Sequence, residues 1–114
     1  MTDSPPWFPS LTTGGDAIAM VDGDRSVTYS ELHDRVGCVT AGLLDGAESL
    51  EEERVAFLYP ASPEYAALII GIVAAGGIAV PLSVHASPAE LAHCLSVAGS
   101  SRLLLPEVLR SDEL

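Results

Sequence analysis

Apolar and polar positions follow two patterns along the chain, one typical of helices and one typical of strands. Between Thr28 and Gly46, apolar residues recur at spacings of four, three and four, which places them on one face of a helix. These residues are Leu32, Val36, Val39 and Leu43. The run Arg54–Tyr59 is apolar without strict alternation and is closed by a proline, which is typical of a strand buried on both faces of a sheet. The first pattern therefore predicts an amphipathic helix and the second a central strand.

The same patterns, followed along the whole sequence, predict strands and helices in turn. We expect short strands at 17–21 and 26–28, a helix between Thr28 and Gly46, a strand at 54–59, a helix at 63–75, a strand at 78–82, a helix between Ser87 and Gly99, and a strand at 102–105. Strands that alternate with helices predict an α/β fold, a mostly parallel sheet flanked by helices. Because the chain stops just after its last strand, we expect it to be the incomplete N-terminal portion of a larger domain.

Residues 1–15 differ from the rest of the chain. They are rich in Pro, Ser, Thr and Gly and show no periodicity, so we expect a flexible N-terminal arm. Residues 16–114 then form the truncated part of the larger domain.

Three of the expected helices begin at recognisable capping residues. Thr28 and Glu31 have the spacing of a capping box, as do Ser87 and Glu90, so each pair can satisfy two backbone N–H groups at a helix start. Ser62 is followed by proline, the residue that favours the first helical position.

The segment Tyr65–Ala89 carries no formal charge over 25 residues and raises the question of a membrane span. A spanning helix needs about 20 continuous helical residues. Gly76, Gly77 and Pro81 interrupt this segment earlier than that. We therefore expect a buried helix followed by a buried strand.

The charge balance excludes several classes of partner. Sixteen Asp and Glu stand against five Arg, with no Lys, and the formal net charge is −11. Nucleic acid is not an expected partner, because no basic stripe can neutralise phosphates, and neither is an anionic membrane surface. Without Lys, the chain can form no Schiff base and contains no phosphate-loop lysine.

The cysteines and the N-terminus indicate a cytoplasmic protein. Cys38 and Cys94 lie far apart in sequence and form no C-x-x-C pair, so we expect two free thiols rather than a disulfide or a zinc site. The first residues have neither the basic start nor the apolar run of a signal peptide.

The three histidines are the first candidates for a metal or ligand site. His33 and His93 fall within expected helices without a second ligand at i+4, so packing or solvent exposure explains them better than metal binding. His85 lies in the loop after the carboxyl end of a strand, where ligands of open α/β sheets bind. We keep His85 as a candidate ligand contact, beside the alternative of an ordinary loop residue.

Other polar motifs are more simply structural. Asp22–Asp24 lacks the further ligands of a calcium loop and predicts a turn, and Glu51–Glu53 predicts a solvated face. Neither Cys38 nor Cys94 has a flanking cation, so a catalytic thiol is not expected. Thr12–Gly15 has no Lys and no following helix, and we interpret it as a linker rather than a phosphate loop. The residues alone thus give no catalytic residue, no metal ligand and no identifiable cofactor-binding residue.

Several stretches of the chain carry a further pattern. Ala17–Gly23 is followed by Val27–Leu32, which contains T-Y-x-E-L, and then by Arg54–Leu58 and Ser62–Tyr65. Gly71–Leu82 has the form G-x-x-x-A-G-x-x-x-x-P-L. Together with His85–Leu91, and in this order, they resemble the opening of the adenylate-forming, or AMP-binding, enzymes. The resemblance covers residues 16–105, and its spacing is closest to the malonyl-CoA synthetase branch of the acyl-CoA synthetases.

The resemblance implies a ligase that works in two steps. A carboxylate attacks the α-phosphate of Mg²⁺-bound ATP and pyrophosphate leaves; the thiol of coenzyme A then displaces AMP from the acyl-adenylate. The phosphate loop, the nucleotide-binding motifs and the catalytic Lys of such enzymes lie downstream of the matching residues, so no catalytic residue is transferred. Thr28–Leu32 and Gly71–Leu82 correspond to scaffold, and the loop Ser83–Ser87 can border the coenzyme A side in some relatives. We therefore expect this chain to be inactive alone, and a small carboxylic acid to be the substrate of the full-length enzyme.

One alternative stays open from the sequence, and a second is disfavoured. The chain could be a stand-alone acidic α/β binding or interaction module derived from such an enzyme, which would unfold cooperatively by itself. A flavodoxin-like nucleotide binder would need a phosphate-cradling first loop. The turn before the Thr28 helix has none.

Overall fold

The computed structural model describes residues 8–100 and 102–106. Its elements, in chain order, are α1 (Ser10–Thr13), β1 (Ile18–Asp22), β2 (Arg25–Thr28), α2 (Tyr29–Leu44), β3 (Arg54–Leu58), α3 (Pro63–Ala74), β4 (Ile78–Leu82), α4 (Pro88–Ala98) and β5 (Arg102–Leu104). Apart from α1, the order is the one that the sequence predicts. Boundaries differ from the expected ones by one or two residues.

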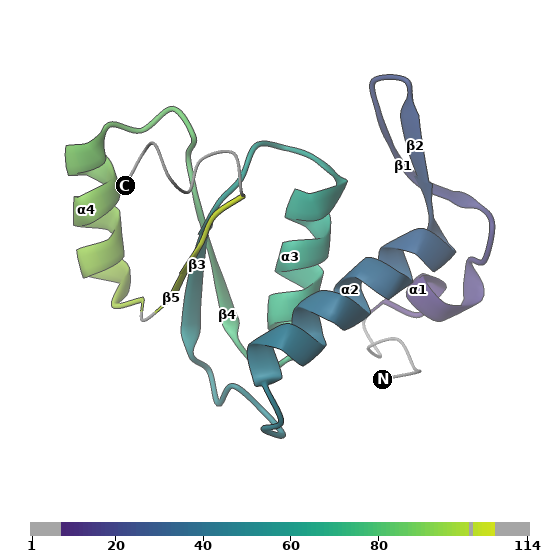
Figure 1. Cartoon of the computed structure of the whole chain (residues 1–114), viewed down its shortest axis with the longest axis horizontal. Coiled ribbons are helices and arrows are strands. Elements are labelled where there is room, and N and C mark those ends of the chain that lie inside the picture. Colours follow the sequence, from purple (N-terminus) through teal and green to yellow (C-terminus); the bar gives the residue numbers. More distant parts are fainter. Residues whose placement is uncertain (1–7, 101, 107–114) are drawn as a thin grey trace.

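The strands form two separate sheets. β3 lies between β4 and β5 and is parallel to both, with Ala56 opposite Val80 on one side and Leu103 on the other. β1 and β2 form an antiparallel hairpin that projects from the body of the molecule (Figure 1). The α/β class and the parallel sheet are therefore confirmed, and the first two strands stand outside that sheet.

Helices cover both faces of the three-stranded sheet (Figure 1). β3 is the centre, because its residues Val55, Ala56 and Phe57 are fully buried. Side chains alternate across a strand, so Val55 and Phe57 pack toward α2 and α3 whereas Ala56 packs toward α4. The sequence prediction of a strand buried on both faces is confirmed.

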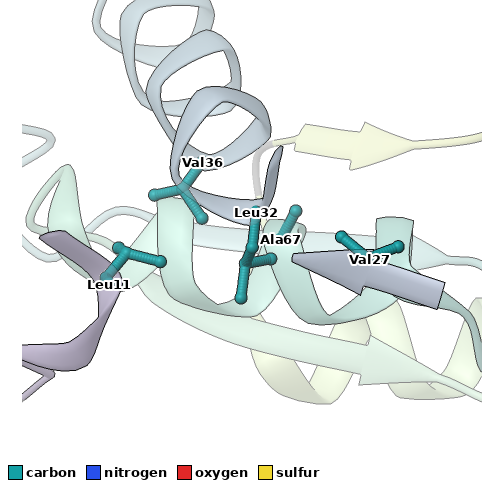
Figure 2. Packing of buried hydrophobic residues seen from close by; sticks show 5 residues of the cluster. All are labelled: Leu11, Val27, Leu32, Val36 and Ala67. Atoms are coloured by element: carbon teal, nitrogen blue, oxygen red, sulfur yellow. The ribbon is translucent and has the colours of Figure 1, made fainter. Parts of the chain in front are cut away.

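A third group of buried residues joins the N-terminal elements to α3. Figure 2 shows its members, which come from α1, β2, α2 and α3: Leu11, Val27, Leu32, Val36 and Ala67. Two of them, Leu32 and Val36, belong to the stripe that predicted α2. This group fixes the base of the hairpin against the helices.

The end of the expected N-terminal arm is structured. Residues Ser10–Thr13 form α1, and the side chain of Leu11 is only 1% exposed. A helix of four residues completes about one turn, so it has no periodicity for a sequence pattern to reveal. Burial of Leu11 against α2 and β2 holds it in place. Residues 1–7 of the expected arm lie outside the described residues.

The segment that raised the question of a membrane span forms α3 followed by β4. In residues 8–100 and 102–106, every helix is too short or too polar to cross a bilayer. The prediction of a helix and then a strand for Tyr65–Ala89 is confirmed.

All three predicted helix starts are confirmed. The backbone N–H of Glu31 donates to Thr28 Oγ1 at 3.1 Å, and the Glu31 carboxylate accepts from the Thr28 N–H at 2.9 Å. These hydrogen bonds, first to the Thr28 backbone and then to its side chain, lower the pKa of Glu31. Ser87 and Glu90 at the start of α4 repeat the same pair of bonds, with the same effect on the pKa of Glu90.

We expect Thr28→Ala to lower the free energy of unfolding by about 1 kcal/mol, because it removes the acceptor for an otherwise unpaired backbone N–H. Urea unfolding followed by circular dichroism measures the change. Thr28→Ser keeps a hydroxyl in the capping position and serves as the control, with stability near that of the parent. Equal losses for the Ala and Ser variants would show that the cap hydrogen bond is not the cause.

Candidate functional site

The three parallel strands end at one edge of the sheet, where ligands of open α/β sheets bind. The loop after β3, Val84 after β4 and Pro106 after β5 meet there and, with residues of the hairpin, enclose a hollow of about 500 Å³. The lining residues are Asp22, Arg25, Tyr59, Pro60, Ala61, Ser62, Glu64, Val84 and Pro106. We call this the carboxyl-edge hollow, and it is the candidate site.

The hairpin brings charged residues to this hollow. Asp22 is the last residue of β1 and Arg25 the first of β2, and the chain turns between them at Gly23, whose φ is +65°. Glycine adopts this left-handed conformation without steric cost. The predicted turn at Asp22–Asp24 is confirmed. Its role is to place Asp22 and Arg25 at the rim of the hollow.

Glu64, in the first turn of α3, links three elements. Its carboxylate accepts a hydrogen bond from Arg25 of the hairpin at 3.2 Å and pairs with Arg35 of α2. Desolvation raises the pKa of Glu64, but its own backbone N–H, the Arg25 hydrogen bond and the charges of Arg25 and Arg35 together lower it below the ordinary value of 4.5. The pairs are half-exposed, so each contributes about 0–1 kcal/mol rather than a large stabilisation.

We expect Glu64→Gln to lower the free energy of unfolding by about 1 kcal/mol or less at neutral pH and low salt. Because the folded-state pKa of Glu64 is lowered, its contribution is present above the ordinary pKa of 4.5 and is lost as pH falls through the lowered value. Urea unfolding at several pH values below 5, and at high salt, measures both effects. Glu48→Gln, at an exposed carboxylate with no ion pair in the described residues, is the control.

A difference between the Glu64→Gln variant and the parent that stays constant from pH 7 to acid would contradict this assignment. So would a difference of the same size in the Glu48→Gln control.

The histidines lie apart from one another. His85 is exposed in the loop after β4, where its backbone N–H donates to Ser83 Oγ at 3.1 Å, and it is not among the residues that line the hollow. His93 is exposed on α4. His33 lies in α2, and its Nε2 is buried without a hydrogen-bond partner in the described part of the chain. The structure therefore brings no two of them into one site.

The remaining candidates do not line the hollow. Cys38 lies on α2 and Cys94 on α4, both exposed thiols outside any disulfide in the described residues. Thr12 and Thr13 belong to α1, and Gly14 packs against the ring of Tyr29, since a Cβ there would lie 2.5 Å from the ring. Within the segment Thr12–Gly15, Thr12 and Thr13 are thus helical and Gly14 is packed, so the segment is more ordered than a simple linker.

The prediction that Glu51–Glu53 forms a solvated face is wrong for one of its residues. Glu51 and Glu52 are exposed, whereas Glu53 pairs with Arg102 Nε at 2.7 Å. The guanidinium of Arg102 also donates to the carbonyl of Leu43 at 3.1 Å. Arg102 thereby supplies the C-terminus of α2 with the cation that its own last turn lacks. A run of three acids in the sequence gives no signal of this long-range partner.

The described residues do not fit a magnesium–nucleotide site. In residues 8–100 and 102–106, no group of three His, Cys, Asp or Glu side chains is placed to hold a metal ion. The whole chain has no Lys to neutralise phosphates, and the two arginines nearest the hollow are already paired with Glu64. The hollow can therefore contribute a wall to a binding site.

Comparison with known proteins identifies the fold and the family. The chain matches the model of the family described as AMP-binding enzyme over residues 9–114, a match that begins before residue 16, where the resemblance placed its start. The solved N-terminal subdomain of NpsA from Klebsiella oxytoca superposes with a TM-score of 0.80 at 23% identity, covering 95% of this chain and 28% of that one. That likeness confirms the fold.

Curated relatives are similar in sequence. The mitochondrial malonate–CoA ligase of Mus musculus is 33% identical over 106 residues, which cover 90% of this chain and 18% of the relative. The 3-hydroxybenzoate–CoA ligase of Aromatoleum sp. (strain CIB) is 36% identical over 88 residues, which cover 76% of this chain and 17% of the relative. The chain thus spans less than a fifth of the length of either. With the family match, these findings confirm the resemblance seen in the sequence: the chain belongs to the AMP-binding enzyme family.

Proposed function

We propose that this chain is the N-terminal portion of an ATP-dependent acyl-CoA synthetase. The family match over residues 9–114 is the observation that carries the proposal. The names of two relatives, a malonate–CoA ligase and a 3-hydroxybenzoate–CoA ligase, support a carboxylic acid as substrate and coenzyme A as acceptor. In the overall reaction, a carboxylate oxygen bonds to the α-phosphorus of ATP and pyrophosphate leaves. The coenzyme A sulfur then bonds to the acyl carbon, and AMP leaves.

The contribution of these residues is a scaffold. The capped helix α2 and the unit of α3 and β4 are the segments that carry the family motifs, and both form the packed body of the structure. At the carboxyl-edge hollow, α3 supplies Glu64, whose charge is paired with that of Arg25. Mg²⁺, ATP and coenzyme A would therefore be bound chiefly by the rest of the enzyme. We place the enzyme in the cytoplasm, with no nucleic acid partner.

The test compares the native gene product with the 114-residue chain. Both are incubated with ATP, Mg²⁺, coenzyme A and a panel of carboxylic acids that includes malonate and 3-hydroxybenzoate. Acyl-CoA is measured by mass spectrometry and adenylation by pyrophosphate exchange. We expect the native product to form acyl-CoA from at least one acid and the 114-residue chain to form none.

A native product without acyl-CoA formation and without pyrophosphate exchange would overturn the proposal. The alternative function, a stand-alone acidic α/β binding module, draws on the net charge of −11 and on the lack of Lys. A native product of 114 residues that unfolds cooperatively would favour that module.

A further inference from the structure

An apolar groove lies between α4 and the face of the sheet that α4 covers. Its volume is about 440 Å³, and the ten residues that line it are Leu, Val, Ala and Pro, so it offers no charged or hydroxyl side chain. Six are leucines: Leu58, Leu82, Leu91, Leu95, Leu103 and Leu105. We call this the α4 groove.

The two faces of the sheet are packed unequally. On one face, α3 buries Leu68 and Ile72. On the other face, α4 buries none of its residues, although Leu91 and Leu95 pack against the sheet. Figure 1 shows α4 on one side of the sheet, with α2 and α3 together on the other. An apolar helix with no buried residue leaves apolar surface in water, the usual mark of an incomplete interface.

Charge disfavours a second copy of the chain as the occupant. Each copy carries a formal net charge of −11, and association would bring two such charges together. The groove itself offers no basic group to offset this repulsion. An occupant that brings apolar side chains and few carboxylates fits better.

The position of the groove favours the polypeptide that follows. Leu105 lines the groove and is followed directly by Pro106, the last residue that the structure describes. Residues 107–114 contain four charged side chains, which suit an apolar groove poorly. Relatives continue much further, because this chain spans 17–18% of their length.

We infer that the α4 groove is an internal packing surface of a longer enzyme, filled by apolar side chains from the polypeptide C-terminal to Leu114. The inference rests on the proposed function, which supplies that polypeptide. In the complete protein, α4 and Val84, which is exposed here, would then be buried.

Cysteine accessibility tests the inference in the native gene product and in the 114-residue chain. In a background in which Cys38 and Cys94 are replaced by Ser, Ala92→Cys places a thiol on the groove wall, and Val97→Cys places one on the same helix outside it. Val97 is 73% exposed. We expect both thiols to react readily with maleimide in the 114-residue chain. In the native product, we expect the thiol of Ala92→Cys to react with maleimide at least about tenfold more slowly than the thiol of Val97→Cys.

Hydrogen exchange of the unsubstituted proteins provides a second measurement. Backbone amides of residues 89–98 in α4 are expected to exchange more slowly in the native product than in the 114-residue chain. An unchanged ratio of thiol rates with unchanged exchange would overturn the inference. Protection of the groove thiol that appears only as protein concentration rises would also overturn it, because it would identify a second copy as the occupant. A native product that ends at Leu114 would overturn it as well.

Acyl-CoA formation by the same native preparation keeps the two proposals distinguishable. An active product with a reactive groove thiol would overturn the inference and leave the proposed function standing. An inactive long product with a protected groove thiol would overturn the function alone.

Discussion

Replacing Phe57 by alanine is expected to lower the free energy of unfolding by about 3–5 kcal/mol, the range for removing a fully buried aromatic side chain. Phe57 lies in the central strand β3 with no exposed surface. Its ring meets that of Tyr65 edge to face, with centroids 5.3 Å apart, and packs in the cluster formed with α2 and α3. The substitution leaves a cavity that the surrounding parallel strands and helices cannot close. Urea unfolding followed by circular dichroism measures the loss.

Val97→Ala is the control for the Phe57 experiment. Val97 is an apolar residue on α4 that is 73% exposed, so its truncation is expected to change stability by less than about 0.5 kcal/mol. A loss below about 1 kcal/mol for Phe57→Ala, with an unchanged dependence on urea, would contradict the assignment of β3 as the core.

Replacing Gly71 by valine is expected to lower the free energy of unfolding by about 3 kcal/mol, the upper part of the range for overpacking. Gly71 is buried where α3 crosses α2, and a Cβ there would lie 2.6 Å from Val39 Cγ1 and 2.8 Å from Val39 Cβ. The helices can accept it only by moving apart. That movement would also disturb the hydrogen bond from Thr40 Oγ1 to the Gly71 carbonyl.

Gly42→Val is the matched control, because Gly42 is also helical and a Cβ there meets no heavy atom within 4 Å. Val39→Ala in the Gly71→Val background is expected to recover part of the loss, since it removes the methyl groups that clash. Equal effects at Gly71 and Gly42 would show that helix propensity, not the contact between α2 and α3, determines the result.

Local features of the fold could be predicted from the sequence because their physical causes lie within a few residues. The capping box at Thr28 and Glu31 and the proline after Ser62 each act within one helical turn, so the positions of α2 and α3 follow from them. The apolar run at 55–59, after Arg54, predicted β3, because successive apolar residues are typical of a strand that is buried on both faces of a sheet.

Long-range pairs could not be predicted in this way. Arg25 and Glu64 are 39 positions apart, and nothing near either residue indicates that the hairpin will reach the first turn of α3. The pairing of Glu53 with Arg102 is equally invisible, because it depends on β5 lying beside β3. These contacts follow from topology, which a periodicity along one segment does not encode.

The candidate site was only partly predictable, for the same reason. The position of His85 after a strand drew attention to the carboxyl edge, which does contain the hollow. The residues that line the hollow come from four separate stretches of the chain, and His85 is not one of them. Leu91 and Leu95 of α4 are only partly buried against the sheet. How far they are covered depends on neighbouring elements, which the sequence of one helix does not reveal.

The most direct test of the central claim is the intact mass of the native protein, measured together with the reading frame beyond Leu114. The chain spans less than a fifth of the length of two relatives in its family. Membership of that family therefore predicts a native mass several times 11.8 kDa. It also predicts a Gly-rich, Lys-bearing phosphate loop in the sequence that follows. A native mass of 11.8 kDa would contradict the claim, because 114 residues without Lys or a metal-binding group in the described part could not carry out adenylation by this route.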